Sequence, residues 1–213
     1  MPKADPMDLL FTYFPGITPT QAGQFAALSD ALYHWNEKIN VVSRKDTDHL
    51  EERHMLHSLS IAKFISFRPG TRIVDVGTGG GFPGLPLAVM FPGCHFTLVD
   101  SVARKIHVVN ELAAAAGLEN VTACQERAEH IADRFDFAVS RAVTAFPQLY
   151  RWTKQLVTPG TGNDLPNGII SLKGGDLTRE LAGFGKRITT TALNTWFGEE
   201  WFATKKLVYL EIK

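Results

Sequence analysis

The sequence predicts an α/β protein with a mostly parallel sheet, an antiparallel last strand and an N-terminal helical extension. Apolar residues recur at helical spacing over the first 70 positions. From Thr71 onward, short apolar runs alternate with helical segments, a pattern typical of crossover units and a parallel sheet. We therefore expect a helical extension over residues 1–70 and an α/β core over residues 71–213.

The helical extension shows a clear start signal. Thr18, Pro19 and Gln21 have the spacing of a capping box with proline at the first helical position. One apolar stripe then follows at helical spacing, formed by Phe25, Leu28, Leu32, Trp35 and Ile39. A turn near Asn40–Lys45 separates this helix from a second one, expected over Asp46–Ile65.

The core alternates strands and helices. The expected strands are Arg72–Val76, His95–Val99, Val121–Cys124, Phe135–Ser140 and Ile169–Leu172. The expected helices are Leu85–Phe91, Val102–Ala116, Ala128–Asp133 and Phe146–Val157. Two further strands, Ile188–Phe197 and Ala203–Lys213, are joined by so short a link that they must form an antiparallel hairpin.

Composition narrows the function. The 213 residues include 22 basic and 22 acidic side chains, and 45% are apolar, which indicates a globular protein without a large positive field. The charge is uneven, −4 over residues 73–140 and +4 over residues 141–213, so a modest basic face is compatible with neutrality. No apolar run is long enough to span a membrane, and two cysteines alone fit a reducing cytoplasm. We expect a cytoplasmic monomer.

A glycine-rich loop, Asp75–Gly84, follows the first expected strand and opens a helix. Its glycines, Gly77 and Gly79 among them, allow a tight turn and a close approach of ligand to backbone. The loop fits either a dinucleotide or S-adenosylmethionine. Asp75 favours the second, because a carboxylate suits the cationic amino and sulfonium groups and would repel a pyrophosphate.

Two later positions fit a bound nucleoside. Asp100 ends the second strand, where a carboxylate can accept both ribose hydroxyls, although it could instead cap the next helix. Ala128 and Glu129 follow the third strand, where an adenine edge would be read, although Glu129 could be a plain first-turn acid. His54 and His57 lie three residues apart, but no third ligand has a recognisable spacing, so we expect no metal.

Five motifs in order resemble one family. They are Trp35-Asn36-x-x-Ile39-Asn40, Arg53-His54-x-x-His57-Ser58-Leu59, Asp75–Pro86, Ser140-Arg141-Ala142 and Leu172-Lys173-Gly174. The chain resembles the small-subunit ribosomal RNA methyltransferase G family, also called glucose-inhibited division protein B. The likeness runs from about Leu32 to Gly174, and it departs from the family at His57, where an aspartate is usual.

The resemblance implies a class I S-adenosylmethionine methyltransferase that methylates N7 of one guanine, position 527, in 16S ribosomal RNA of the small subunit. It places cofactor contacts on Gly77, Phe82, Ala128, Glu129 and Arg141. Asp100 matches the family's strand-end acid.

Guanine N7 has a lone pair and no proton, so its methylation needs positioning rather than a general base. We expect His54, Arg141 and Lys173 to contact the RNA or the reacting groups, although each could be structural. The residues that could form a phosphate-binding face are Lys45, Arg53, Arg104, Lys105, Lys186, Arg187, Lys205 and Lys206.

Three other functions stay open. The chain could methylate another RNA, a protein or a small molecule, or it could be a ribosome-assembly factor that keeps the fold without catalysis. A nicotinamide-dependent oxidoreductase is disfavoured by Asp75.

Overall fold

A computed structural model describes residues 8–39, 41, 43 and 49–213. The expected turn at Asn40–Lys45 and the start of the second helix at Asp46 fall largely outside these residues. Within the described chain, no helix is both long and apolar enough to cross a membrane.

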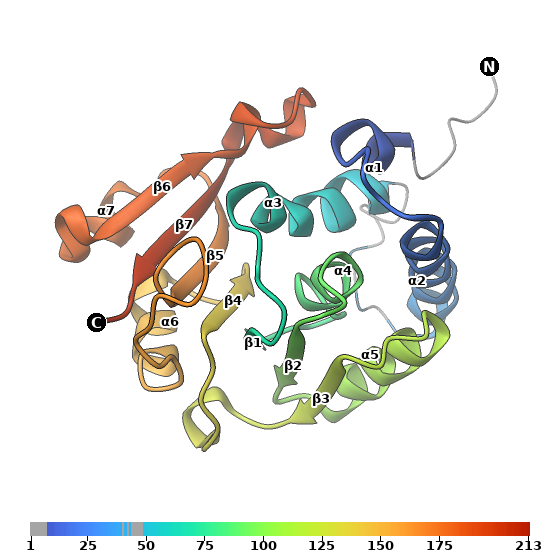
Figure 1. The fold of residues 1–213 in the computed structure, drawn as a ribbon, viewed down its shortest axis with the longest axis horizontal. Coiled ribbons are helices and arrows are strands. Elements are labelled where there is room, and N and C mark those ends of the chain that lie inside the picture. The colour runs from blue at the N-terminus through green and yellow to red at the C-terminus, as the bar shows by residue number, and fades with distance from the viewer. Residues whose placement is uncertain (1–7, 40, 42, 44–48) are drawn as a thin grey trace.

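A seven-stranded sheet in the order β3-β2-β1-β4-β5-β7-β6 forms the centre of the molecule (Figure 1). Its strands are β1 Arg72–Val76, β2 His95–Asp100, β3 Val121–Gln125, β4 Phe137–Arg141, β5 Gly168–Gly174, β6 Ile188–Ala192 and β7 Lys205–Glu211. The pairs among β1 to β5 are parallel, and β7 is antiparallel to both β5 and β6. The predicted mostly parallel sheet with an antiparallel last strand is confirmed.

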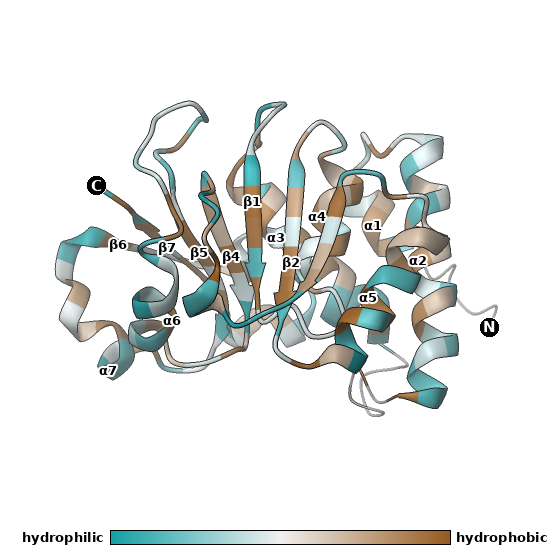
Figure 2. Cartoon of the chain, turned by 90° about the horizontal axis from the view of Figure 1, so that it is seen from below, coloured by the Kyte–Doolittle hydropathy of each residue, from teal (hydrophilic) through white to brown (hydrophobic). Residues whose placement is uncertain are grey.

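Helices cover both faces of the sheet. They are α1 Asp8–Tyr13, α2 Pro19–Lys38, α3 His57–Phe64, α4 Gly84–Met90, α5 Ala103–Ala115, α6 Phe146–Thr153 and α7 Thr178–Leu181. Helices α1 to α5 share one hydrophobic cluster with one face of the sheet, and α6 packs in a second cluster on the other. Figure 2 accordingly shows apolar stretches in both β1 and β2. The boundary near residue 70 stays a prediction.

The capping box predicted for α2 is confirmed. Thr18 accepts a hydrogen bond from the Gln21 backbone, and the Gln21 side chain accepts one from the Thr18 backbone. The Gln21 amide also donates to the carbonyls of Val89 and Met90 at the end of α4. The same residue therefore starts α2 and fixes it against the core.

Five segments differ from the prediction. The second helix begins with a π-helical stretch, η2 Glu51–Leu56, before α3. The stretch Ala128–Asp133 forms only a 3-10 turn, η3 Ala128–His130. The strand expected over Ile188–Phe197 ends at Ala192, because the next residues turn to bury Leu193 and Phe197 on one side. Short helices α1 and α7 were not predicted.

Candidate active site

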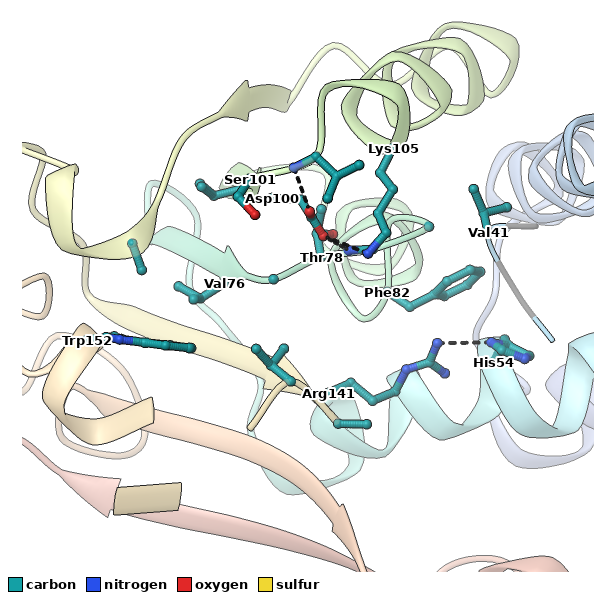
Figure 3. Close-up of a pocket in the computed structure, with 18 of the residues that line it drawn as sticks. Val41, His54, Val76, Thr78, Phe82, Asp100, Ser101, Lys105, Arg141 and Trp152 are labelled. Atoms are coloured by element: carbon teal, nitrogen blue, oxygen red, sulfur yellow. Dashed lines mark hydrogen bonds and ion pairs between the residues drawn. The ribbon is translucent and has the colours of Figure 1, made fainter. Parts of the chain in front are cut away.

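A cavity of about 670 Å³ opens at the carboxyl ends of β1, β2 and β4 (Figure 3). Strand order runs outward in opposite directions from β1 and β4, so the loops that follow these two strands diverge there. This switch point is where open α/β sheets bind ligands. The fold therefore brings the glycine loop and Arg141, at the end of β4, together at one cavity.

The glycine loop depends on Gly77 for its shape. Gly77 has φ +69°, and its N–H donates to the Val99 carbonyl of β2 at 2.8 Å. A Cβ at this position would lie 2.6 Å from Val143 Cγ2 in the loop after β4. Gly79 also has positive φ but has no atom within 4 Å of an added Cβ. The loop is thus closely packed at Gly77 and open at Gly79, and both residues line the cavity.

Asp75, which we expected to face a ligand, lies beneath the loop and is not among the residues that line the cavity. Its side chain is fully buried, and its Oδ2 accepts hydrogen bonds from Thr78 Oγ1 at 2.6 Å and from Gly84 N at 2.9 Å. Burial raises its pKa to about 7, although these hydrogen bonds and Arg141 oppose the shift. Asp75 therefore shapes the loop rather than presenting a charge to the cavity.

Asp100 does line the cavity, as expected of a strand-end acid. Its Oδ1 accepts from Val102 N at 2.9 Å, so it also takes the capping role left open above. Its Oδ2 accepts from Gly79 N at 3.1 Å and lies 3.4 Å from Lys105 Nζ. Ala128 and Glu129 line the same end of the cavity from η3, Ala128 buried and Glu129 exposed.

Arg141, His54 and Phe82 meet at the other end. Arg141 donates from Nη2 to His54 Nδ1 at 2.9 Å and from Nη1 to the Arg53 carbonyl at 3.0 Å. The centre of the Phe82 ring lies 4.8 Å from the guanidinium carbon of Arg141 and 5.2 Å from the centre of the His54 ring. Figure 3 shows the guanidinium pointing toward His54. Because a guanidinium can only donate, His54 Nδ1 is the acceptor.

The π-helical stretch positions this cluster. Irregular π turns within helices are frequent at functional sites, and η2 supplies both the Arg53 carbonyl and the His54 ring to Arg141. His57, one residue beyond η2, also lines the cavity. Burial, reinforced by the charges of Arg141 and Lys205, lowers the pKa of His57 well below its usual value.

Lys173, for which we expected a role in RNA contact or catalysis, is not among the residues that line the cavity. Its Nζ pairs with Glu180 Oε1 at 2.8 Å and donates to the Thr144 carbonyl, and its side chain is 10% exposed. Glu180 Oε1 also accepts from Phe146 N at 2.6 Å. Lys173 and Glu180 therefore hold the loop after β4 in place, because Lys173 bonds to Thr144 and Glu180 bonds to Phe146. The charge of Lys173 is paired with that of Glu180.

The basic side chains that were expected to form one phosphate-binding face lie in separate parts of the structure. Arg53, Lys105 and Lys205 line the cavity. Lys186 and Arg187 precede β6, whose first residue pairs with Leu210, so they lie at the end of the hairpin remote from Lys205. Lys45 lies outside the described residues.

Several cavity residues were missed by sequence reasoning. They are Val41, Ser101, Val143, Trp152 and Trp201. Trp152 and Trp201 come from α6 and from the 3-10 turn η6 Glu200–Thr204. No local pattern marks them, because they reach the cavity only when distant elements pack together. Ser101, directly after Asp100, was the one position that a strand-end rule could have found.

Comparison with known structures confirms the fold. A solved structure described as a SAM dependent methyltransferase from Aquifex aeolicus superimposes with a TM-score of 0.58 over 81% of this chain and 100% of that one, at 14% identity. This likeness concerns the fold alone.

Sequence comparison identifies the family. The chain is 50% identical over 204 residues to a "Ribosomal RNA small subunit methyltransferase G" of Cytophaga hutchinsonii, covering 96% of this chain and 99% of the relative. It is 51% identical over 208 residues to the protein of the same name from Flavobacterium johnsoniae, covering 97% and 99%. The family model "GidB: rRNA small subunit methyltransferase G" matches residues 21–200. With this coverage, the chain belongs to the ribosomal RNA small subunit methyltransferase G family.

Proposed function

We propose that this protein transfers the methyl group of S-adenosylmethionine to N7 of one guanine in 16S ribosomal RNA. The observation that carries the proposal is a single cavity that joins an acid-bearing nucleoside end, at Asp100, to an aromatic and cationic end at Arg141. The relatives' name, "Ribosomal RNA small subunit methyltransferase G", supports the ribosomal substrate.

The residues present fit S-adenosylmethionine. Gly79 leaves open space beside the backbone, and Asp100 offers a carboxylate at the cavity wall for the ribose hydroxyls. Ala128 and Glu129 would contact the adenine, while Gly77, Phe82 and Arg141 would surround the methionine part. Asp75 supports this end from below through Thr78 and Gly84. When bound, the cofactor supplies an electrophilic methyl group.

The target atom explains the kind of residues around the cavity. Guanine N7 presents an in-plane lone pair and carries no proton, so the protein has only to hold the base in line with the methyl group. Positioning of this kind contributes about 7–11 kcal/mol to lowering a barrier. His54 acts here through Arg141, by accepting its hydrogen bond, and not as a base for N7.

The position of Arg141 limits its repulsion of the positively charged 7-methylguanine product. N7 methylation leaves a positive charge on the ring, and a cation beside N7 would oppose it. The guanidinium is tied by two hydrogen bonds to Arg53 and His54 of η2, which leaves it suited to O6 or to the cofactor's carboxylate. Lys173 acts at a distance by holding the loop that follows Arg141.

The proposal is tested with methyl-labelled S-adenosylmethionine and small ribosomal subunits that lack the modification, with naked 16S RNA in parallel. We expect one methyl group per subunit, at a guanine that becomes sensitive to aniline cleavage after borohydride reduction, as 7-methylguanine is. Asp100→Asn should weaken cofactor binding measured by calorimetry, while Asp133→Asn, an exposed acid outside the cavity, should not. Cofactor binding without transfer to RNA would point to an assembly factor, and transfer to another atom would refute the N7 assignment.

We propose the monomer, in the cytoplasm, as the acting form. The basic side chains at the cavity, Arg53, Lys105 and Lys205, are few, so bulk charge supplies only part of the affinity. This suits salt-sensitive but not very tight binding, in which the shape of a defined RNA structure supplies much of the selection. Light scattering of the purified protein alone and with small subunits tests the stoichiometry.

A further inference from the structure

The cavity has a second wall that the cofactor does not need. Beyond Arg141, its lining continues to His57 at the start of α3, Trp201 in η6 and Lys205 at the start of β7. These elements are far apart in the chain and meet only here. In the proposed reaction this wall faces whatever receives the methyl group.

His57 carries a buried acceptor without a partner. The residue is 6% exposed, and Nε2 makes no hydrogen bond with the described part of the chain. The hydrogen bond between the ring and the Arg53 backbone assigns the ring proton to Nδ1, which leaves Nε2 with its lone pair. The lowered pKa described above keeps the ring neutral. A buried acceptor left unpaired is costly and calls for an explanation.

Trp201 and Lys205 surround this acceptor with groups suited to a nucleotide. The Trp201 ring stands nearly perpendicular to the His57 ring, with centres 5.0 Å apart. Lys205 Nζ lies 4.3 Å from the centre of the Trp201 ring. An indole offers a face on which a base can stack, and an ammonium group is a suitable point charge for a phosphate.

We propose that His57, Trp201 and Lys205 form the seat of the target guanine, with His57 Nε2 accepting the hydrogen of guanine N1. This inference rests on the proposed function. In guanine, N1 lies on the Watson–Crick edge and N7 on the neighbouring Hoogsteen edge, so a base held at N1 by this wall keeps N7 free to face the cofactor. Trp201 moves from the edge of His57 onto the base, and Lys205 contacts a flanking phosphate.

The seat gives the enzyme a means to reject adenine. Adenine N1 carries no hydrogen, so its lone pair would face that of His57 Nε2. A site built to hydrogen-bond one group discriminates strongly against an analogue that lacks it, because the buried partner is left unpaired. Reading of the base edge after it leaves the helix is common to enzymes that act on nucleobases.

The test compares three forms of the target base in a minimal RNA or a reconstituted small subunit: guanine, inosine and 2-aminopurine. Inosine keeps N1–H and lacks the amino group, whereas 2-aminopurine keeps the amino group and lacks N1–H. For the unaltered protein we expect inosine to retain most of the kcat/KM of guanine and 2-aminopurine to fall about 10-fold or more.

His57→Phe removes the acceptor and keeps an aromatic ring. We expect it to lower kcat/KM for guanine and inosine about 10-fold while leaving 2-aminopurine unchanged. His57→Asn, which retains a side-chain oxygen acceptor, should restore part of the preference. Trp201→Phe should keep the preference while raising KM. His34→Phe makes the same change at an exposed histidine of α2 outside the cavity and should leave every value unaltered.

Two measurements, methylation of guanine and cofactor affinity, separate failure of this inference from failure of the proposed function. If the unaltered protein does not methylate guanine at all, the proposed function fails. If it does, but His57→Phe and His57→Asn both keep the guanine, inosine and 2-aminopurine ratios of the parent, the seat is refuted. Loss of calorimetric S-adenosylmethionine binding in both His57 variants would likewise refute it, because His57 would then support the cofactor end.

Discussion

Asp75→Asn gives a sharp test of how burial governs the glycine loop. The carboxyl group is completely buried, and burial raises its pKa from 3.8 to about 7. A raised pKa means that the folded protein holds this proton more tightly than the unfolded chain does. The stability from the protonated group is therefore complete below about pH 4 and is lost as the pH rises to about 7.

The expected size follows from the shift. A change of one pKa unit corresponds to about 1.4 kcal/mol, so this shift of about three units makes ionised Asp75 cost about 4 kcal/mol above pH 7. Asparagine keeps an oxygen acceptor for Thr78 and Gly84 but cannot ionise. The variant should become more stable than the parent as pH rises, with the difference growing by about 3 kcal/mol between pH 4.5 and pH 8.5.

Urea unfolding of both proteins at these two pH values measures the difference. Other groups, including buried His57, titrate in both proteins alike, so the comparison isolates position 75. Asp133→Asn, at a side chain 73% exposed, is the matched control and should show no such divergence. If Asp75→Asn destabilises the protein equally at both pH values, the hydrogen bonds to the ionised carboxylate outweigh its burial, and the argument fails.

Three further changes test the structure. Gly77→Ala should lower the free energy of unfolding by about 3 kcal/mol, because left-handed backbone strain of about 1–2 kcal/mol adds to a collision with the loop after β4. Gly79→Ala should cost the strain alone. Equal losses for the two variants in urea titrations would contradict this. Lys173→Met should lower the free energy of unfolding by up to about 3 kcal/mol, because it leaves Glu180 without its partner. The double variant that also carries Glu180→Gln should recover part of this stability. Additive losses in a double-mutant cycle would show that the pair is not coupled. Thr18→Ala should cost about 1 kcal/mol in thermal or urea unfolding, and no change would mean that the capping box adds nothing.

Much of the fold is visible in local sequence patterns. The alternation of apolar runs and helices after Thr71 predicts the parallel sheet. The antiparallel end was also predicted, although the link between β6 and β7, residues 193–204, is longer than expected. The capping box at Thr18 predicts the start of α2. These features depend on neighbours within a few positions, so one segment at a time is enough to predict them.

The π-helical stretch and the ends of short strands are different. The stretch from Glu51 to Leu56 has a helical pattern but follows a wider hydrogen-bond register. The strand after Ile188 ends early because Leu193 and Phe197 turn into a cluster with Phe202. Such choices depend on packing against partners that are distant in sequence, and periodicity alone does not reveal them.

The candidate site also has features that local sequence predicts and features that depend on long-range packing. Local sequence patterns were enough to predict that a glycine loop opens a helix and that acids lie at or next to the ends of the first two strands, because both are properties of short segments. Long-range packing is needed to see that Asp100 lines the cavity while Asp75 is buried, that Lys173 pairs with Glu180, and that His57 and Trp201 reach the same wall. The physical reason is that a side chain's surroundings depend on which distant elements pack against it, and strand register and layer packing decide that.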